Sequence, residues 1–302
     1  MILIRSFLPK SLLAAATLFA SSSYLPLHAQ SPSYSSFSAQ VVGQGPHLIF
    51  VPDMGCPPSV FQQTVDSLKN TFTCHLLSIA GFAGTPPSGS DHLLEHLKND
   101  LVFYIRDHGL QRPVLIGHGY GALAGLWMAA QEPELPGGLV VIDALPFQPA
   151  ASQPDLNPQI AAPVANRRQQ QLLALTPEQF ETMQRQRAAG LFTDPLLRRN
   201  YVDWMKQSDR TTLAKATFEF MTLDLREQLY AVTAPVLVLV AGGLADAAAE
   251  GNLITVFQDQ YRQVHRLHME VHDTARHFIM LDDPTWFRER LLRFVALVHG
   301  RR

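Results

Sequence analysis

The chain has 302 residues, a formal net charge of -2 and 47% hydrophobic residues. This length and apolar content are enough for one large core, which predicts a single α/β domain with an insertion rather than several small domains. The near-even charge balance, with no run of Lys or Arg interleaved with aromatic residues, argues against a nucleic-acid partner.

The N-terminal segment has the composition of an export signal. Arg5 and Lys10 flank the start of an apolar run over residues 11–20, and a small-residue cleavage site precedes Gln30. The apolar run is shorter than the roughly 20 residues that span a bilayer. We therefore expect a signal peptide over residues 1–29, a periplasmic or secreted mature protein, and no membrane contact after cleavage. An uncleaved membrane anchor is the alternative.

After a serine-rich linker that reaches about residue 38, short apolar runs alternate with helical patterns. This alternation predicts βαβ units, and therefore a mostly parallel, doubly wound sheet with helices on both faces. The predicted strands cover residues 47–51, 74–79, 113–116, 138–142, 235–240 and 268–271. The predicted helices between the early strands cover residues 59–70, 91–108 and 120–128.

Between residues 146 and 225 the strand pattern disappears, and helical patterns rich in Gln, Arg and Leu replace it. Within this segment Thr176-Pro177-Glu178-Gln179 has the residues of a helix N-terminus: a capping threonine, a proline in first position and a capping-box glutamine. We expect residues 146–225 to form a helical lid over the carboxyl ends of the strands, where open α/β sheets bind ligands. The core then consists of residues 30–145 and 226–302.

The segment Gly117-His118-Gly119-Tyr120-Gly121 joins a predicted strand to a predicted helix. Its glycine spacing is that of the G-x-S-x-G nucleophile elbow, a tight turn that lifts a central serine into an active site. Here Gly119 occupies the centre, so the attacking oxygen is missing. Glycine adopts positive φ without steric cost, which predicts a turn relieved of about 1 to 3 kcal/mol of strain.

In these motifs the chain resembles an exported α/β-hydrolase with a helical lid, over about residues 40–299. The resemblance implies descent from serine hydrolases that act on esters or related acyl compounds. It implies that His277, which follows the last predicted strand, is the general base of a catalytic triad. The acid is then Asp246, in a G-x-x-D turn after the strand 235–240, with Asp143 before the lid as the alternative.

The resemblance also implies an oxyanion hole built from two backbone N–H groups. One belongs to Tyr120, the residue after the centre of the elbow, and the other to Met54, in the loop after the strand 47–51. That loop departs from the family's usual His-Gly start, because Pro52 and Asp53 stand there instead. A carboxylate turned toward the oxyanion site would oppose its electrostatic role.

A dinucleotide-binding site is an alternative for the same turn. Gly117, Gly119 and Ala122 match the G-x-G-x-x-G/A fingerprint, and Asp143 lies about 20 residues further on. Two observations argue against it: the turn follows two strand-helix units instead of opening the fold, and dinucleotide enzymes are rarely exported.

Residue spacing favours neither a metal site nor a disulfide. A zinc site built from His118, His272, His277 and an aspartate lacks close ligand spacing, so no metal and no cofactor are predicted. Cys56 and Cys74 are expected at opposite edges of the parallel sheet, whereas a disulfide needs Cα atoms within about 7 Å. We therefore expect two free thiols.

Three explanations of Gly119 remain open: a variant of an active enzyme, a natural non-catalytic binding protein, or an enzyme with another nucleophile, for which Cys56 is the candidate. His277 and its acid could also activate water directly. In each case we expect a small acyl or ester-like ligand and no acyl-enzyme chemistry at position 119. If a triad surrounds only a missing hydroxyl, Gly119→Ser should restore hydrolysis of short p-nitrophenyl esters.

Overall fold

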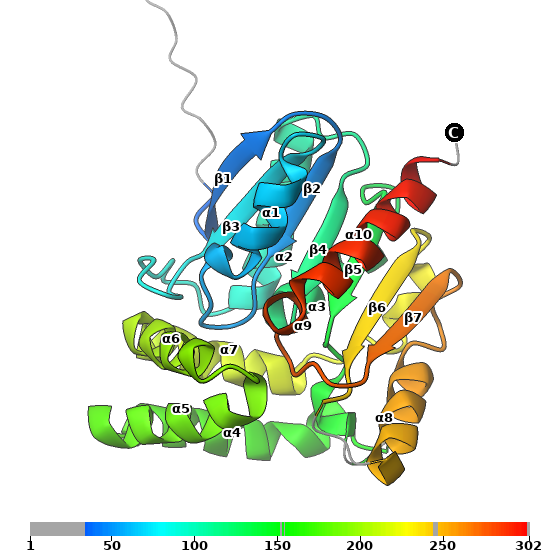
Figure 1. Cartoon of the computed structure of the whole chain (residues 1–302). Helices are drawn as coiled ribbons and strands as arrows, with labels where there is room; N and C mark the ends of the chain where they lie inside the picture. The colour runs from blue at the N-terminus through cyan, green and yellow to red at the C-terminus, as the bar shows by residue number, and fades with distance from the viewer. Residues whose placement is uncertain (1–33, 152, 154, 244–246, 301–302) are drawn as a thin grey trace, which may run out of the picture. The chain divides into compact units, whose positions relative to one another are not determined.

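The computed structural model describes residues 34–151, 153, 155–243 and 247–300, which form a seven-stranded sheet with helices around it (Figure 1). The strand order is β1-β3-β2-β4-β5-β6-β7. The strands are β1 (Phe37–Gly43), β2 (His47–Val51), β3 (Thr73–Ile79), β4 (Val114–His118), β5 (Gly138–Ile142), β6 (Val236–Ala241) and β7 (Leu267–His272). All neighbouring pairs are parallel except β1 with β3, which confirms the expected fold class.

The edge strand β1 was not predicted from the sequence. A linker was expected up to residue 38, but β1 begins at Phe37 and pairs antiparallel with β3 from Phe37–Ile79 to Gly43–Thr73. Phe37 is buried, whereas most of the other β1 residues are exposed. An edge strand has only part of its surface on the core, so it lacks the continuous apolar run that identifies the central parallel strands.

Helices cover both faces of this sheet (Figure 1). Helices α1 (Gln62–Leu68) and α10 (Pro284–His299) lie on one face, and α2 (Leu93–Asp107) and α3 (Tyr120–Gln131) lie on the other. Asp283 caps α10 by accepting a hydrogen bond from the backbone N–H of Trp286 at 3.0 Å. The other helical elements of the core are η1 (Pro58–Phe61), η3 (Gln228–Ala231), α8 (Ala247–Gln260) and α9 (Ile279–Asp282).

An all-helical insert connects β5 to β6, as the sequence predicts. It consists of η2 (Gln148–Ala151), α4 (Pro158–Ala174), α5 (Pro177–Leu191), α6 (Pro195–Gln207) and α7 (Arg210–Thr222). The capping box at the start of α5 is present: the Thr176 hydroxyl accepts from the Gln179 N–H at 3.2 Å, and the Gln179 side chain accepts from the Thr176 N–H at 2.9 Å. The role of the insert as a lid stays a prediction.

Contacts with the strand loops fix the insert at the carboxyl end of the sheet. The backbone N–H of Asp209 donates to the Gly81 carbonyl at 2.8 Å, and the N–H of Gly84 donates to the Gln207 carbonyl at 3.1 Å. A Cβ atom on Gly55 would overlap the Met205 sulfur of α6, so the loop after β2 also lies against the insert. The insert thus covers the loops that follow β2 and β3.

Three expectations concern the compartment of the protein and its thiols. The predicted signal peptide, residues 1–29, lies outside the described residues. Within the described part of the chain, no helix is long and apolar enough to cross a membrane. Cys56 and Cys74 are both buried and free, which confirms the expected pair of thiols.

Candidate active site

The turn between β4 and α3 keeps the backbone of a nucleophile elbow around a glycine. Gly119 has φ 50° and ψ -113°, in the left-handed half of the backbone map that favours glycine. A Cβ atom on Gly117 would overlap the backbone of Ala122, and one on Gly121 would overlap the Val51 carbonyl. Strand and helix therefore approach as closely as the G-x-S-x-G spacing requires.

The Asp53 carboxylate fills the space beside Gly119. Its Oδ1 accepts a hydrogen bond of 2.6 Å from the backbone N–H of Tyr120, and a Cβ atom on Gly119 would overlap the same carboxylate. A serine at position 119 would overlap this carboxylate unless Asp53 moved, and the expectation that Gly119→Ser alone completes a triad stays a prediction. The Tyr120 N–H, predicted for an oxyanion, binds Asp53 instead. The donor role of Met54 stays a prediction.

His277 lies between two carboxylates. Its Nδ1 is 2.8 Å from Asp143 Oδ2, and its Nε2 is 3.1 Å from Asp53 Oδ2. Asp143 is the acid that the sequence ranked second. The preferred acid, Asp246, lies outside the described residues, and both ring nitrogens of His277 have carboxylate partners without it.

The backbone around Asp143 holds its carboxylate toward His277. Asp143 follows β5 and adopts a left-handed conformation with φ 44°. Its N–H donates to the Leu239 carbonyl at 2.8 Å, and its Oδ1 accepts from the Ala241 N–H at 3.1 Å. A non-glycine residue at positive φ is uncommon, and such strain concentrates at functional sites.

The two carboxylates determine the charge of His277. Burial alone lowers the pKa of this imidazole, but the hydrogen bonds and charges of Asp143 and Asp53 outweigh burial and raise it to about 9. Burial also disfavours the charged form of Asp53 and would raise its pKa. His277, His118 and the Tyr120 N–H outweigh burial and hold this pKa well below its usual range. At neutral pH the pair is an imidazolium and a carboxylate, so His277 donates protons here and is a poor general base for water.

Tyr120 connects the elbow to the insert. Its ring is fully buried, and its hydroxyl donates to Glu219 Oε2 of α7 at 2.8 Å. The same carboxylate oxygen accepts from the Leu94 N–H at the start of α2 at 3.0 Å. Burial raises the pKa of Glu219. The sequence did not single out Glu219, because a lone glutamate in a predicted helix has no motif around it.

The structure argues against two of the alternatives that the sequence left open. Cys56 is 1% exposed, and burial raises the pKa of its thiol well above the ordinary value, which disfavours the reactive thiolate. In a dinucleotide site a pyrophosphate would bind the N-terminus of α3. The Asp53 carboxylate already occupies the Tyr120 N–H at that terminus and would repel a second anion.

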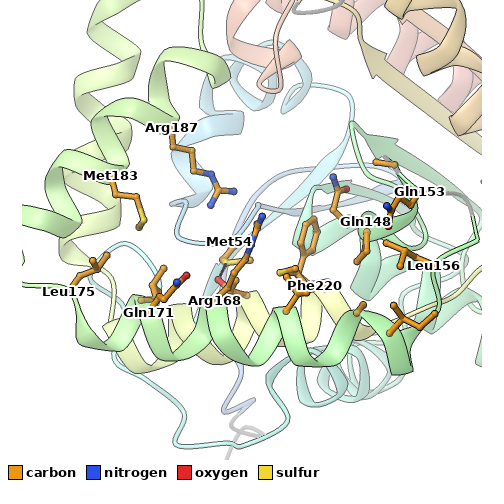
Figure 2. A pocket seen from close by; sticks show the side chains of 18 of the residues that line it. Met54, Gln148, Gln153, Leu156, Arg168, Gln171, Leu175, Met183, Arg187 and Phe220 are labelled. Atoms are coloured by element: carbon orange, nitrogen blue, oxygen red, sulfur yellow. Dashed lines mark hydrogen bonds between the residues drawn. The ribbon is translucent and has the colours of Figure 1, made fainter.

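A pocket of about 1220 Å³ lies against the insert, next to the loop that carries Asp53. Met54, Phe220 and residues of α4 and α5 line it (Figure 2). Arg168 and Arg187 turn their guanidinium groups into this pocket, near Met54 (Figure 2). Among the described residues that line it, none is acidic, and neither arginine forms an ion pair or hydrogen bond within the described chain.

Comparison with known proteins identifies the scaffold. The model of the alpha/beta hydrolase family matches residues 48–290. The chain belongs to this family. A pimeloyl-[acyl-carrier protein] methyl ester esterase of Vibrio vulnificus is 23% identical to this α/β-hydrolase over 258 residues, which cover 85% of this chain and 97% of that protein.

Solved structures show the same fold. An esterase from Exiguobacterium antarcticum superposes with a TM-score of 0.71 at 13% identity, over 86% of this chain and 95% of that one. The enol-lactonase from Burkholderia xenovorans LB400 superposes with a TM-score of 0.70 at 16% identity, over 86% and 96% of the two chains. The sequence comparison places an esterase among the relatives of this α/β-hydrolase, while the centre of its own elbow is Gly119, which has no hydroxyl.

Proposed function

We propose that this protein is an exported α/β-hydrolase that binds a small acyl or ester-like molecule and forms no acyl-enzyme at its elbow. The observation that carries the proposal is the position of the Asp53 carboxylate, which occupies the side-chain space at Gly119 and the N–H of Tyr120. An acyl transfer needs both of these places, one for the attacking oxygen and one for the oxyanion.

The pocket supports an anionic ligand with an apolar part. Two arginines without ion-pair partners in the described chain face a pocket whose described lining has no acidic residue, and Leu, Ile, Val, Met and Phe side chains share that lining. Guanidinium groups match carboxylate and phosphate geometry. The helical insert would then act as the lid of this pocket, and the family's esterases make an acyl or ester-like ligand the natural class.

The absence of acyl-enzyme chemistry is tested with four proteins: wild type, Gly119→Ser, Asp53→Gly, and the double variant that carries both substitutions. In buffer that contains a chelator, wild type and the single variants should hydrolyse p-nitrophenyl butyrate at the uncatalysed rate and resist labelling by a fluorophosphonate. The double variant offers a serine hydroxyl, a free Tyr120 N–H and the His277–Asp143 pair, so we expect a gain of at least tenfold and covalent labelling.

The triple variant with His277→Ala is the control, and it should lose the gain. A burst of p-nitrophenol or covalent labelling of the wild type at an elbow residue would show that the proposal is wrong. A double variant that folds but gains nothing would show that the other half of the triad is not competent.

Ligand binding is tested separately by thermal denaturation with octanoate and with its methyl ester. A ligand that binds only the folded state raises the melting temperature by mass action. We expect octanoate to stabilise the protein more than the ester does, and Arg168→Gln with Arg187→Gln to remove this preference. Equal effects of both compounds on the wild type would contradict the anionic ligand class.

A further inference from the structure

Three side chains of metal-ligand type meet at the candidate site, from three different segments of the chain. Asp53 follows β2, His118 ends β4 and His277 follows β7. One ligand atom from each lies within 4.8 Å of the other two. This cluster differs from the zinc site considered from the sequence, because His272 pairs with Asp283 Oδ2 at 3.2 Å and is not among the three.

His118 has an unshared lone pair in a buried position. The side chain is fully buried, and its Nε2 is 3.0 Å from the backbone carbonyl of His277. A carbonyl oxygen only accepts hydrogen bonds, so the ring proton of the neutral imidazole is on Nε2 and Nδ1 is bare. Within the described chain Nδ1 has no hydrogen-bond partner. An unpartnered buried nitrogen is costly unless something binds it.

Each of the three residues also has the outer contact that metal ligands have. Metal-binding histidines donate their second ring N–H to a carboxylate or a backbone carbonyl, which fixes the ring. His277 Nδ1 meets Asp143 Oδ2 at 2.8 Å, and His118 Nε2 meets the His277 carbonyl. Asp53 Oδ1 is held by the Tyr120 N–H, which leaves Oδ2 toward the centre of the cluster.

We propose that Asp53, His118 and His277 bind a divalent transition-metal ion such as Zn²⁺, in place of the proton between Asp53 Oδ2 and His277 Nε2. These two atoms are 3.1 Å apart, close to the roughly 3.3 Å edge of a tetrahedron with bonds near 2.05 Å. The third ligand atom, on His118, lies within 4.8 Å of the ligand atoms of Asp53 and His277. Asp53 and Asp143 supply two formal negative charges for the two positive charges of the ion, and Arg187 adds a positive charge that interacts with Asp53.

Two imidazoles and one carboxylate leave a coordination position open for water, as in catalytic zinc sites. The side chains of Asp53 and His277 retain 12% and 19% exposure, so the site is not sealed. A metal ion lowers the pKa of its bound water to about 7. Metal binding itself does not depend on the proposed function. Its catalytic consequence does: the bound water would be the nucleophile that position 119 lacks.

The test uses the full chain without a histidine tag, stripped with a chelator and titrated with Zn²⁺ and with Co²⁺. We expect one ion per chain, visible Co²⁺ absorption of the intensity typical of tetrahedral sites, and a rise in melting temperature that chelator reverses. A wild-type protein that binds neither ion would overturn the proposal.

Variants identify the ligands. Asp53→Asn keeps the shape of the side chain and its acceptor for the Tyr120 N–H, so it should fold, yet we expect at least a tenfold loss of affinity. His118→Asn should lose affinity similarly, and Asp143→Asn, which acts through His277, by about 10- to 100-fold. His272→Gln is the matched control and should bind normally. Unchanged affinity in folded Asp53→Asn, or an equal loss in His272→Gln, would refute the site.

Failure of the metal proposal and failure of the proposed function can be distinguished. The double variant Asp53→Gly with Gly119→Ser lacks one ligand of the proposed metal site, and its esterase activity is measured in chelator. A gain of activity there says nothing about metal binding by the wild type. Conversely, metal binding by the wild type is read from absorption and stoichiometry, without any substrate.

Discussion

The two halves of the candidate site differ in how far they keep the arrangement of a serine hydrolase. In one half, His277 follows the last strand and meets Asp143 at 2.8 Å, as a triad base meets its acid. In the other half, Gly119 has no side chain, and the Asp53 carboxylate fills the space beside it. A side chain introduced at position 119 alone would therefore meet this carboxylate.

The shape of the turn at Gly119 and the chemistry of the site depend on different residues. The turn at Gly119 keeps its shape because Gly117 and Gly121 let strand and helix backbones meet, whatever residue stands at the centre. The chemistry depends instead on which side chains three separate loops bring together. The fold of the turn is therefore independent of the residue at its centre.

The largest effect is expected from Gly119→Ser with Asp53 unchanged. The new side chain overlaps a carboxylate that is held by the Tyr120 N–H and by His277, and it also adopts φ 50°. We expect the free energy of unfolding to fall by about 2 to 4 kcal/mol. Urea denaturation measures it.

Asp53→Gly completes a double-mutant cycle with Gly119→Ser. Because it removes the overlap, the double variant should be more stable than the sum of the two single effects predicts, by about 1 to 3 kcal/mol. Additive effects would mean that Asp53 does not occupy the space at Gly119.

The half of the site that contains His277 and Asp143 is tested by Asp143→Ala. This change removes the partner of His277 Nδ1 and the acceptor for the Ala241 N–H, and it places alanine at φ 44°. We expect a loss of about 2 to 3 kcal/mol in the free energy of unfolding. Asp143→Asn keeps an acceptor and tolerates positive φ, so about 1 kcal/mol is expected. Equal losses in the two variants would contradict this account.

The sequence predicted the parallel strands and the helical insert because buried strands are continuous apolar runs and helix starts have capping residues. It missed β1, whose partly exposed edge pattern resembles a linker. In the site, it identified His277 and the elbow from local motifs. The position of Asp53 depends on a contact between two loops 67 residues apart, and no local pattern encodes such a contact. The sequence did contain one indication of this contact. It has glycine at the centre of the elbow, and it also has Asp53 in the loop where the family usually has His-Gly.

A smaller effect is expected where the elbow meets the insert. Tyr120→Phe removes the hydroxyl that donates to Glu219 Oε2 and leaves the backbone N–H on Asp53 unchanged. Glu219 keeps its bond from Leu94, so we expect a loss of about 1 kcal/mol in the free energy of unfolding. Tyr230→Phe, at a tyrosine that is 65% exposed, is the control and should change stability by less than about 0.5 kcal/mol. A loss as small in Tyr120→Phe would mean that Glu219 does not connect the two regions.

The smallest effect at neutral pH should come from His75, a buried histidine without the carboxylates that surround His277. Its ring lies between the Tyr104 hydroxyl and His47, and burial, with the charges of His47 and His108, lowers its pKa to about 4. The folded state therefore holds this imidazole neutral, whereas the unfolded chain takes up a proton below about pH 6.5. Stability from this group is complete above pH 6.5 and is lost as the pH falls toward 4.

Replacing His75 with Gln should consequently flatten the decline in stability between pH 6.5 and 4, measured by urea denaturation at each pH. The matched control is His265→Asn, at an exposed histidine, which should leave the decline unchanged. His75 is buried and His277 is half-buried, so a steep decline that persists in His75→Gln would mean that the surroundings of His75 do not oppose its protonation. The contrast between a histidine among carboxylates and one among histidine and tyrosine rings would then fail at His75, while the contacts of His277 with Asp143 and Asp53 would be unaffected.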